Sequence, residues 1–242
     1  MMPPDAPRTI TIQPLLDRFP NFRVSVVVGV DLVCPSSAPA ALDDWIEETV
    51  AGALARDGGR ALAEIPEIRD WREAYKAFGV KQTRYRCSVE RLIKSIAAGK
   101  GLARILPLVD LYNAISVRHI VPVGADDLDQ VAGNMAFRFA KPGDSFQRLG
   151  SAPGEEDPPK EGEVVLADAQ KVLCRRWNWS QDRRSALGAA TRACVITLQS
   201  LGQGDADAAG AELEARLIDL CGGRVDRFSL SANNPIEELP TP

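Results

Sequence analysis

The sequence has little histidine, no paired cysteines and no long apolar run. It contains one histidine in 242 residues, and its five cysteines lie far apart without a CxxC pair. A structural zinc site needs closely spaced Cys or His ligands, so we expect no metal and no other cofactor. An odd number of scattered cysteines, without an export signal, predicts free and buried thiols.

Signals for a membrane or for secretion are also missing. The longest apolar run, from Val24 to Val33, is interrupted by Ser25 and Asp31 and is too short to span a bilayer. The first ten residues, MMPPDAPRTI, have neither the basic start nor the apolar stretch of a secretory signal. We therefore expect a cytoplasmic protein without membrane contact.

Standard catalytic signatures are absent as well. The chain has no GxSxG elbow, no phosphate-binding glycine loop with lysine, no HExxH and no dinucleotide-binding glycine pattern. The formal net charge is −4 and the isoelectric point is about 5.2. This acidic balance argues against non-specific binding to nucleic acids, DNA included, and leaves a local basic face possible.

The pattern of apolar residues predicts a mixed fold. Helices are expected over 42–57, 66–79, 88–99, 106–113 and 207–221, and strands over 22–33, 135–139, 163–168, 170–177, 192–199 and 225–230. Because these elements do not alternate as βαβ units, we predict an α+β fold, one domain over 1–242 with a largely antiparallel sheet flanked by helices. Residues 150–162 are expected to form a surface loop, and 231–242 a loosely held tail.

Three groups of polar residues stand out in apolar surroundings. Arg84 and Arg86 lie on one face of an extended segment, where they could bind a carboxylate or phosphate, or be solvated or paired within the fold. The second group lies in the stretch 106–129, and the third surrounds a Trp-x-Trp pair at 177–179. The residues are Asp110, Asn113, Ser116, Arg118 and His119 in the second group, and Asp168, Arg175, Arg176, Trp177, Asn178, Trp179 and Asp182 in the third.

Each of these groups has a structural and a functional interpretation. A lone histidine such as His119 is more often a partner within the fold than a catalyst. The structural interpretation of Asp110 and Asn113 is that they cap their helix and fasten the loop after it. Aromatic rings beside arginines can stack on a nucleobase, and they can equally anchor a core.

Four segments, taken in order, resemble the B3/B4 domain of the phenylalanyl-tRNA synthetase beta chain and its free-standing relatives. They are YKAFGVKQTRYRCSVERL at 75–92, LPLVDLYNAISVRHIVPVGADDLD at 106–129, FRFAKPGDSF at 137–146 and EGEVVLADAQKVLCRRWNWSQD at 161–182. Each segment alone is a weak signal. Their common order makes the resemblance specific, and it is strongest over 65–200.

The resemblance implies an editing site, at which a wrong amino acid is hydrolysed from the 3′ end of tRNA. It implies a pocket built from Asn113, the loop 116–124 and the segment 175–182. The synthetase has a histidine where this chain has Gly124, and its editing glutamate corresponds to Asp182. The implied catalytic residues are Asn113, His119 and Asp182, and the implied substrate-binding residues are Arg84, Arg86, Ser116, Arg118, Gly124, Arg175, Arg176, Trp177, Asn178 and Trp179.

Three functions follow from this resemblance. The first is a trans-acting aminoacyl-tRNA deacylase with the acceptor end of an aminoacylated tRNA as its partner. The second is a non-catalytic module that binds tRNA with the same pocket, and the third is a binder or enzyme for free amino acids. An aminoacyl ester is already reactive, so positioning of water and stabilisation of the oxyanion can suffice for hydrolysis. The oligomeric state is left open.

Overall fold

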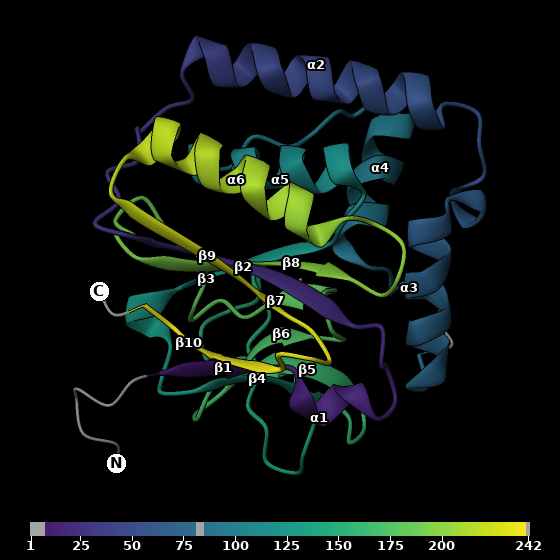
Figure 1. Cartoon of the computed structure of the whole chain (residues 1–242), viewed down its shortest axis with the longest axis vertical. Coiled ribbons are helices and arrows are strands. Elements are labelled where there is room, and N and C mark those ends of the chain that lie inside the picture. Colours follow the sequence, from purple (N-terminus) through teal and green to yellow (C-terminus); the bar gives the residue numbers. More distant parts are fainter. Residues whose placement is uncertain (1–7, 81–84, 241–242) are drawn as a thin grey trace.

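The computed structural model describes residues 8–80 and 85–240 and contains two β-sheets and a layer of helices (Figure 1). The first sheet has the order β10-β1-β4-β5-β6-β7, and the second has the order β3-β8-β2-β9. The strands are β1 Thr9–Thr11, β2 Arg23–Val30, β3 Val123–Asp127, β4 Met135–Phe139, β5 Val164–Ala167, β6 Val172–Arg175, β7 Ser180–Gln181, β8 Cys194–Ser200, β9 Arg224–Leu230 and β10 Ile236–Glu238. The α-helices are α1 Gln13–Leu16, α2 Ala40–Asp57, α3 Pro66–Ala77, α4 Ser88–Ala97, α5 Pro107–His119 and α6 Ala206–Cys221.

Both sheets are almost entirely antiparallel, which confirms the predicted fold class. The one parallel pair joins β1 to β4, and every other pair of neighbouring strands runs antiparallel. Helices α5 and α6 lie on the outer face of the second sheet, α2 packs against α5 farther out, and the first sheet lies on the other face of the second sheet (Figure 1). The second sheet is therefore covered on both sides.

Strand β2 shows how the sequence builds this central layer. Its residues Val24, Val26 and Val28 pack in the core shared with the first sheet, whereas Val27 packs in the core beneath the helices. A strand covered on both faces is apolar on both, and for this reason 22–33 has no polar alternation. The helix side is so close that a Cβ on Gly210 of α6 would lie 2.1 Å from the Ser25 hydroxyl oxygen.

Helix α5 is longer than the sequence predicts. We expected a helix over 106–113 and a loop over 116–124, but α5 continues to His119 and stops at Ile120, whose φ is +53°. The Ser116 hydroxyl donates to the Val121 carbonyl at 2.7 Å and helps to reverse the chain there. The next segment, 123–127, forms β3, which the prediction missed, and pairs with β8.

Two further expectations are wrong. Cys34 and Cys221 form a disulfide, because the end of α6 returns to the segment after β2, where the Val33 amide also donates to the Cys221 carbonyl. Cys87, Cys174 and Cys194 are free and buried, as predicted. The tail expected to be loose contains β10, which pairs with β1 near the opposite end of the chain.

Candidate functional site

A short turn between β6 and β7 brings the Trp-x-Trp segment into the core. Arg176 and Trp177 have φ of +48° and +65°, a backbone conformation that is costly for residues with a side chain. Trp177 is fully buried, and its ring meets those of Phe19, Phe22 and Trp71 edge-on at 4.7, 4.9 and 5.2 Å between centroids. This aromatic packing holds the strained turn in place.

The turn presents Asn178 to a chain of buried polar groups. The Tyr75 hydroxyl donates to Asn178 Oδ1 at 2.9 Å, and Asn178 Nδ2 donates to Gln199 Oε1 at 3.1 Å. Gln199 Nε2 donates in turn to Thr197 Oγ1 at 3.2 Å, and that hydroxyl donates to the Gly124 carbonyl at 3.4 Å. We call these five residues, together with Asp126, the inner polar layer. It joins α3, the β6–β7 turn, β8 and β3.

Asp126 is the carboxylic acid of the inner polar layer. It is two residues beyond Gly124 in β3, so the two residues share one face of the strand. Its Oδ1 accepts from the Ser185 hydroxyl at 2.7 Å and from the Gln181 side-chain amide. Burial raises the pKa of Asp126 to about 7, against the hydrogen bonds from Ser185 and Gln181, which lower it.

The Asp126 carboxyl also affects the pKa values of two neighbouring side chains. Burial and the nearby Asp126 charge raise the pKa of Tyr112 on α5 well above its ordinary value. Burial and the same charge raise the pKa of the Cys174 thiol to about 12. The hydrogen bond from Gln181 places Asp126 beside β7, and its strand β3 contacts α5, the helix that carries Asn113.

Asn113 and Gly124 retain room for a ligand. Asn113 is half-buried, and within the described residues its side chain forms no hydrogen bond. A Cβ added to Gly124 would meet a single neighbouring atom within 4 Å, Thr197 Oγ1 at 3.8 Å. The missing side chain at this position thus leaves space beside the inner polar layer.

His119 lies in a different place from the inner polar layer. Its Nε2 contacts Glu212 Oε2 on α6 at 2.8 Å, and Arg118 Nε lies 3.4 Å from the same oxygen. Arg216 also binds Glu212, at 2.9 Å. The end of α5 and the side of α6 are therefore joined by one carboxylate with three basic neighbours.

Asp182 is fully occupied by partners. Its two carboxylate oxygens accept from the Gln147 amide at 2.8 Å and the Arg184 amide at 2.7 Å. The Arg184 guanidinium adds hydrogen bonds at 2.9 and 2.7 Å, and Asp182 is completely buried. These contacts fix the strand end after β7 and leave little of the carboxylate for a substrate.

Most of the predicted basic residues are neutralised. Arg86 and Arg72 both pair with Glu90, which is fully buried on α4. Arg175 binds Glu163 through two hydrogen bonds of 2.9 and 3.1 Å. Arg84 lies outside the described residues.

Arg176 is the exception among these arginines. Its guanidinium carbon lies 3.7 Å from the Tyr85 ring centroid and 4.6 Å from that of Trp179. It reaches Glu163 only at 3.5 Å, and its Nη1 is buried without a hydrogen-bond partner. Burial lowers the pKa of Arg176. The turn therefore carries a cation held mainly by aromatic rings.

The structure brings some predicted site residues together and separates others. Asn178 and Gly124 are linked through Gln199 and Thr197 in the inner polar layer, and Arg176, Trp177 and Trp179 lie in the adjoining turn. Ser116, Arg118 and His119 belong to the end of α5, and Asp182 belongs to its ion pair with Arg184. Sequence reasoning missed Asp126, Thr197 and Gln199. The alternation along 123–127 and 192–199 was the signal that could have found them.

The described residues were searched for a metal site and for a membrane-spanning helix. No group of three or more His, Cys, Asp or Glu side chains is placed to hold a metal ion in the part of the chain that the structure describes. None of the helices in that part combines the length and apolar character that a bilayer crossing requires.

A sequence model of the B3/4 domain matches residues 70–210, more than half of the chain, so this protein belongs to the B3/4 domain family. It is a module related to a tRNA synthetase. The phenylalanine–tRNA ligase beta subunit of Fusobacterium nucleatum is 33% identical over 81 residues, which cover 34% of this chain and 10% of that subunit.

One solved structure shows a weaker similarity to this chain. An N-terminal fragment of the phenylalanyl-tRNA synthetase beta subunit from Pyrococcus horikoshii has 12% identity and a TM-score of 0.44. The match covers 94% of this chain and 56% of that fragment. This chain thus matches about a tenth of the length of the bacterial subunit and about half of the archaeal fragment.

Proposed function

We propose that this protein is a trans-acting editing hydrolase that cleaves the ester of misacylated aminoacyl-tRNA, with Asp126 as the group that activates water. The observation that carries the proposal is the position of Asp126, buried on the same face of β3 as Gly124, in a strand that contacts α5, the helix that bears Asn113. Membership of the B3/4 domain family and a relative named as a phenylalanine–tRNA ligase beta subunit support tRNA as the partner.

Hydrolysis of the ester needs one general base and one hydrogen-bond donor to the oxyanion. A water molecule attacks the ester carbonyl carbon while the Asp126 carboxylate accepts its proton. The bond between that carbon and the terminal ribose oxygen then breaks, and the ribose oxygen takes back the proton from Asp126, which releases the amino acid and leaves a free hydroxyl on the tRNA. The Asn113 amide, which has no partner among the described residues, is placed in this proposal as a donor to the oxyanion.

Asp126 is matched to this task at neutral pH. A general base works best when its pKa is near the working pH, and burial raises the pKa of Asp126 to about 7. His119 and Asp182, which the sequence suggested as catalytic, are each engaged with charged partners. We therefore assign positioning or structural roles to His119 and Asp182.

The ion pairs of His119 with Glu212 and of Asp182 with Arg184 favour a second function, binding of tRNA without hydrolysis. If His119 and Asp182 carry the family's chemistry, their engagement with Glu212 and Arg184 leaves a module that binds aminoacylated tRNA without hydrolysing it. In that case the aromatic pair around Arg176 would contact the unpaired acceptor end by stacking.

The test is a deacylation assay on a panel of correctly and incorrectly charged tRNAs. We expect at least one misacylated species to be hydrolysed faster than in buffer, with a rate that rises as pH increases through about 7. Asp126→Asn should abolish the acceleration and Asn113→Ala should reduce it. Asp129→Asn is the matched control, because Asp129 is an exposed acid shortly after the same strand.

Two results would end the enzyme proposal. One is that no species is hydrolysed faster than in buffer, and the other is that Asp126→Asn retains the wild-type rate. A mobility-shift assay with the same tRNAs then separates the binding module from a protein without an RNA partner.

A further inference from the structure

Positive charge is concentrated in one stretch of an otherwise acidic chain. Residues 69–104 contain ten Lys and Arg and three Asp and Glu, whereas the whole chain has 29 Lys and Arg and 33 Asp and Glu. Two of the ten, Lys81 and Arg84, lie outside the described residues. The other eight lie on or close to α3 and α4, so the positive charge is local to one part of the molecule.

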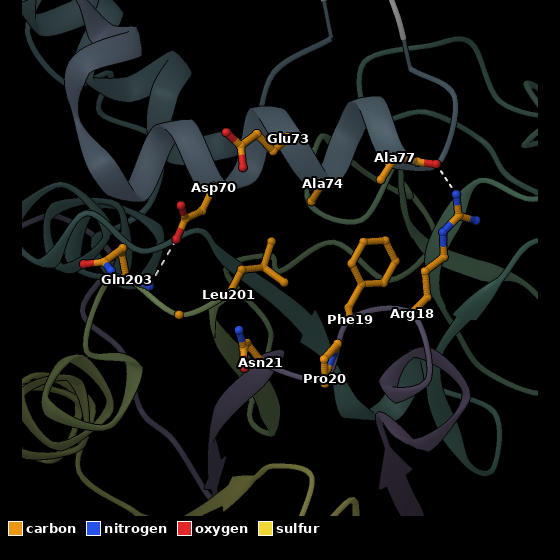
Figure 2. A pocket seen from close by; sticks show the side chains of 11 residues that line it. Arg18, Phe19, Pro20, Asn21, Asp70, Glu73, Ala74, Ala77, Leu201 and Gln203 are labelled. Atoms are coloured by element: carbon orange, nitrogen blue, oxygen red, sulfur yellow. Dashed lines mark hydrogen bonds between the residues drawn. The ribbon is translucent and has the colours of Figure 1, made fainter.

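The basic residues of α3 form a row along the helix. Arg69, Arg72 and Lys76 have the i, i+3, i+7 spacing that places side chains on one face. The two acids later in α3, Asp70 and Glu73, line a surface cleft that α3 forms with residues 18–21 and 201–203 (Figure 2). The basic row lies outside that cleft and is free to face another partner.

A buried carboxylate joins this row to α4. Glu90, in the first turn of α4, is fully buried, and its Oε1 accepts from Arg72 Nε at 3.2 Å and from the Arg86 guanidinium. Two guanidinium groups share one carboxylate, so the three side chains together keep a positive charge. The Arg72 and Arg86 side chains are 31% and 24% exposed. They are therefore held in place while part of each remains accessible to a phosphate.

Helix α4 extends the positive surface past Glu90. Lys94 is four residues after Glu90, on the same side of α4 and one turn further on. Arg91 and Lys94 are exposed, as are Arg69 and Lys76 on α3. Within the part of the chain that the structure describes, none of these four forms an ion pair. We call the following six residues the basic face: Arg69, Arg72, Lys76, Arg86, Arg91 and Lys94.

The basic face borders the turn that presents Asn178. Arg91 Nη1 donates to the Trp179 carbonyl at 2.9 Å, and the Ser88 amide, three residues before Arg91, donates to the Asn178 carbonyl at 3.1 Å. The half-buried rings of Tyr85 and Trp179 meet at this border, with 4.9 Å between centroids. Cations beside aromatic rings suit a polynucleotide, because its phosphates bind the cations and its unpaired bases stack on rings. This combination favours RNA over an anionic lipid surface, which offers charge alone.

We propose that the basic face binds the phosphate backbone of tRNA next to its acceptor end. The choice of tRNA rests on the proposed function, because contacts to phosphates do not distinguish one RNA from another. The backbone crosses α3 and α4, and the unpaired 3′ end passes Trp179 toward Asn178. An acidic protein can bind RNA in this way because its basic residues are gathered on one surface.

The test is a titration of 5′-labelled, unacylated total tRNA with the full chain, followed by fluorescence anisotropy at salt concentrations between about 50 and 200 mM. The triple variant Arg69→Gln, Lys76→Gln, Lys94→Gln should bind at least about tenfold more weakly at the lowest salt concentration. Each lost phosphate contact lowers the slope of log K against log salt by about 0.7 to 0.9, so the slope should fall by about 2 to 3. Lys94→Gln alone should lower it by about 1.

A matched triple variant removes the same charge elsewhere. Lys141→Gln, Arg148→Gln and Lys160→Gln change one arginine and two lysines, all exposed, between β4 and β5. This control should bind tRNA as wild type does. Thermal denaturation should give the same midpoint for wild type and both triple variants, because only exposed side chains without ion pairs are replaced.

The same variants separate the basic face from the hydrolase proposal. Unacylated tRNA binds without hydrolysis, so Asp126→Asn should bind it as wild type does and lose only deacylation. The basic-face triple variant should instead raise KM for misacylated tRNA and leave kcat unchanged. Weakened binding in that variant, without deacylation by wild type, would support the basic face and end the hydrolase proposal.

Three results would overturn the proposal. The first is no anisotropy change with wild type at about 100 μM protein, since even non-specific binding would be detected there. The second is the same tRNA affinity for the two triple variants. The third concerns vesicles of phosphatidylserine and phosphatidylcholine. If they bind wild type as tightly as tRNA does, and lose binding in the basic-face variant, the face belongs to an anionic membrane.

Discussion

The inner polar layer and a surface cleft between α3, residues 18–21 and residues 201–203 use polar residues in opposite ways (Figure 2). Inside the fold, Asn178, Gln199 and Thr197 satisfy one another, because a buried polar group without a partner costs about 1–3 kcal/mol. At the surface, Glu73 and Arg18 can remain without ion pairs, since water solvates them. A buried site must therefore be built by the fold, whereas a surface site can keep its charges for a ligand.

Trp177 is the residue that connects the two regions, and its removal should have the largest effect. It packs on Phe19 at the floor of the cleft and directly precedes Asn178 in the inner polar layer. Trp177→Ala should lower the free energy of unfolding by about 3–5 kcal/mol, as deletion of a buried aromatic side chain does. Chemical denaturation measures this, with the half-buried Trp179→Ala as the comparison. Equal losses in both variants would contradict the central place of Trp177.

Asp126 should make the stability of the inner polar layer depend on pH. Its folded pKa of about 7 lies above the ordinary 3.8, so its contribution is fully present below pH 3.8 and is lost as pH rises through about 7. The full difference corresponds to about 4 kcal/mol.

The measurement for Asp126 is a series of denaturation curves between pH 4 and 8. Wild type should lose up to about 4 kcal/mol over this range relative to Asp126→Asn, which cannot ionise. Parallel pH curves for the two proteins would show that the carboxyl is not held neutral by the fold.

Asp182 tests whether an expected catalytic residue is structural. Asp182→Asn replaces a buried acceptor of four hydrogen bonds by a group that brings two donors of its own. We expect a loss of about 2–3 kcal/mol in unfolding free energy. An unchanged stability together with lost deacylation would restore Asp182 to the catalytic site.

A substitution in the cleft should have the smallest effect on stability. Glu73 is exposed and forms no ion pair among the described residues, so Glu73→Gln should change the unfolding free energy by less than about 0.5 kcal/mol. Thermal denaturation of wild type and Glu73→Gln measures this difference. A large destabilisation would mean that Glu73 supports the fold.

The regular elements were largely predictable because each has a strong local pattern. Helix α3 begins at Pro66 and ends one residue before Phe78, close to the predicted limits, and β2 lies within the predicted strand. Strand β3 was missed, because a short segment rich in Gly and Asp has little intrinsic preference for a strand. Only its pairing with β8 makes it one.

The candidate site was predictable only in part. The order of the four segments identified the family. Gly124 and Asn178, both predicted for the site, are linked through Thr197 and Gln199. The partners of His119 and Asp182 could not be foreseen, because Glu212 is 93 residues from His119 and the Arg184 contact depends on how the chain turns after β7. The pattern around Thr197 and Gln199 predicts a strand and gives no sign of a site.

The sequence by itself determined the α+β class, the membership of the B3/4 domain family and the positions of most helices and strands. These depend on local periodicity and on the order of segments along one chain. The tertiary structure decided which polar side chains are hydrogen-bonded or ion-paired within the fold and which remain available to a ligand. That decision depends on contacts between residues far apart in the chain, such as Tyr75 with Asn178 and His119 with Glu212, which no local pattern encodes.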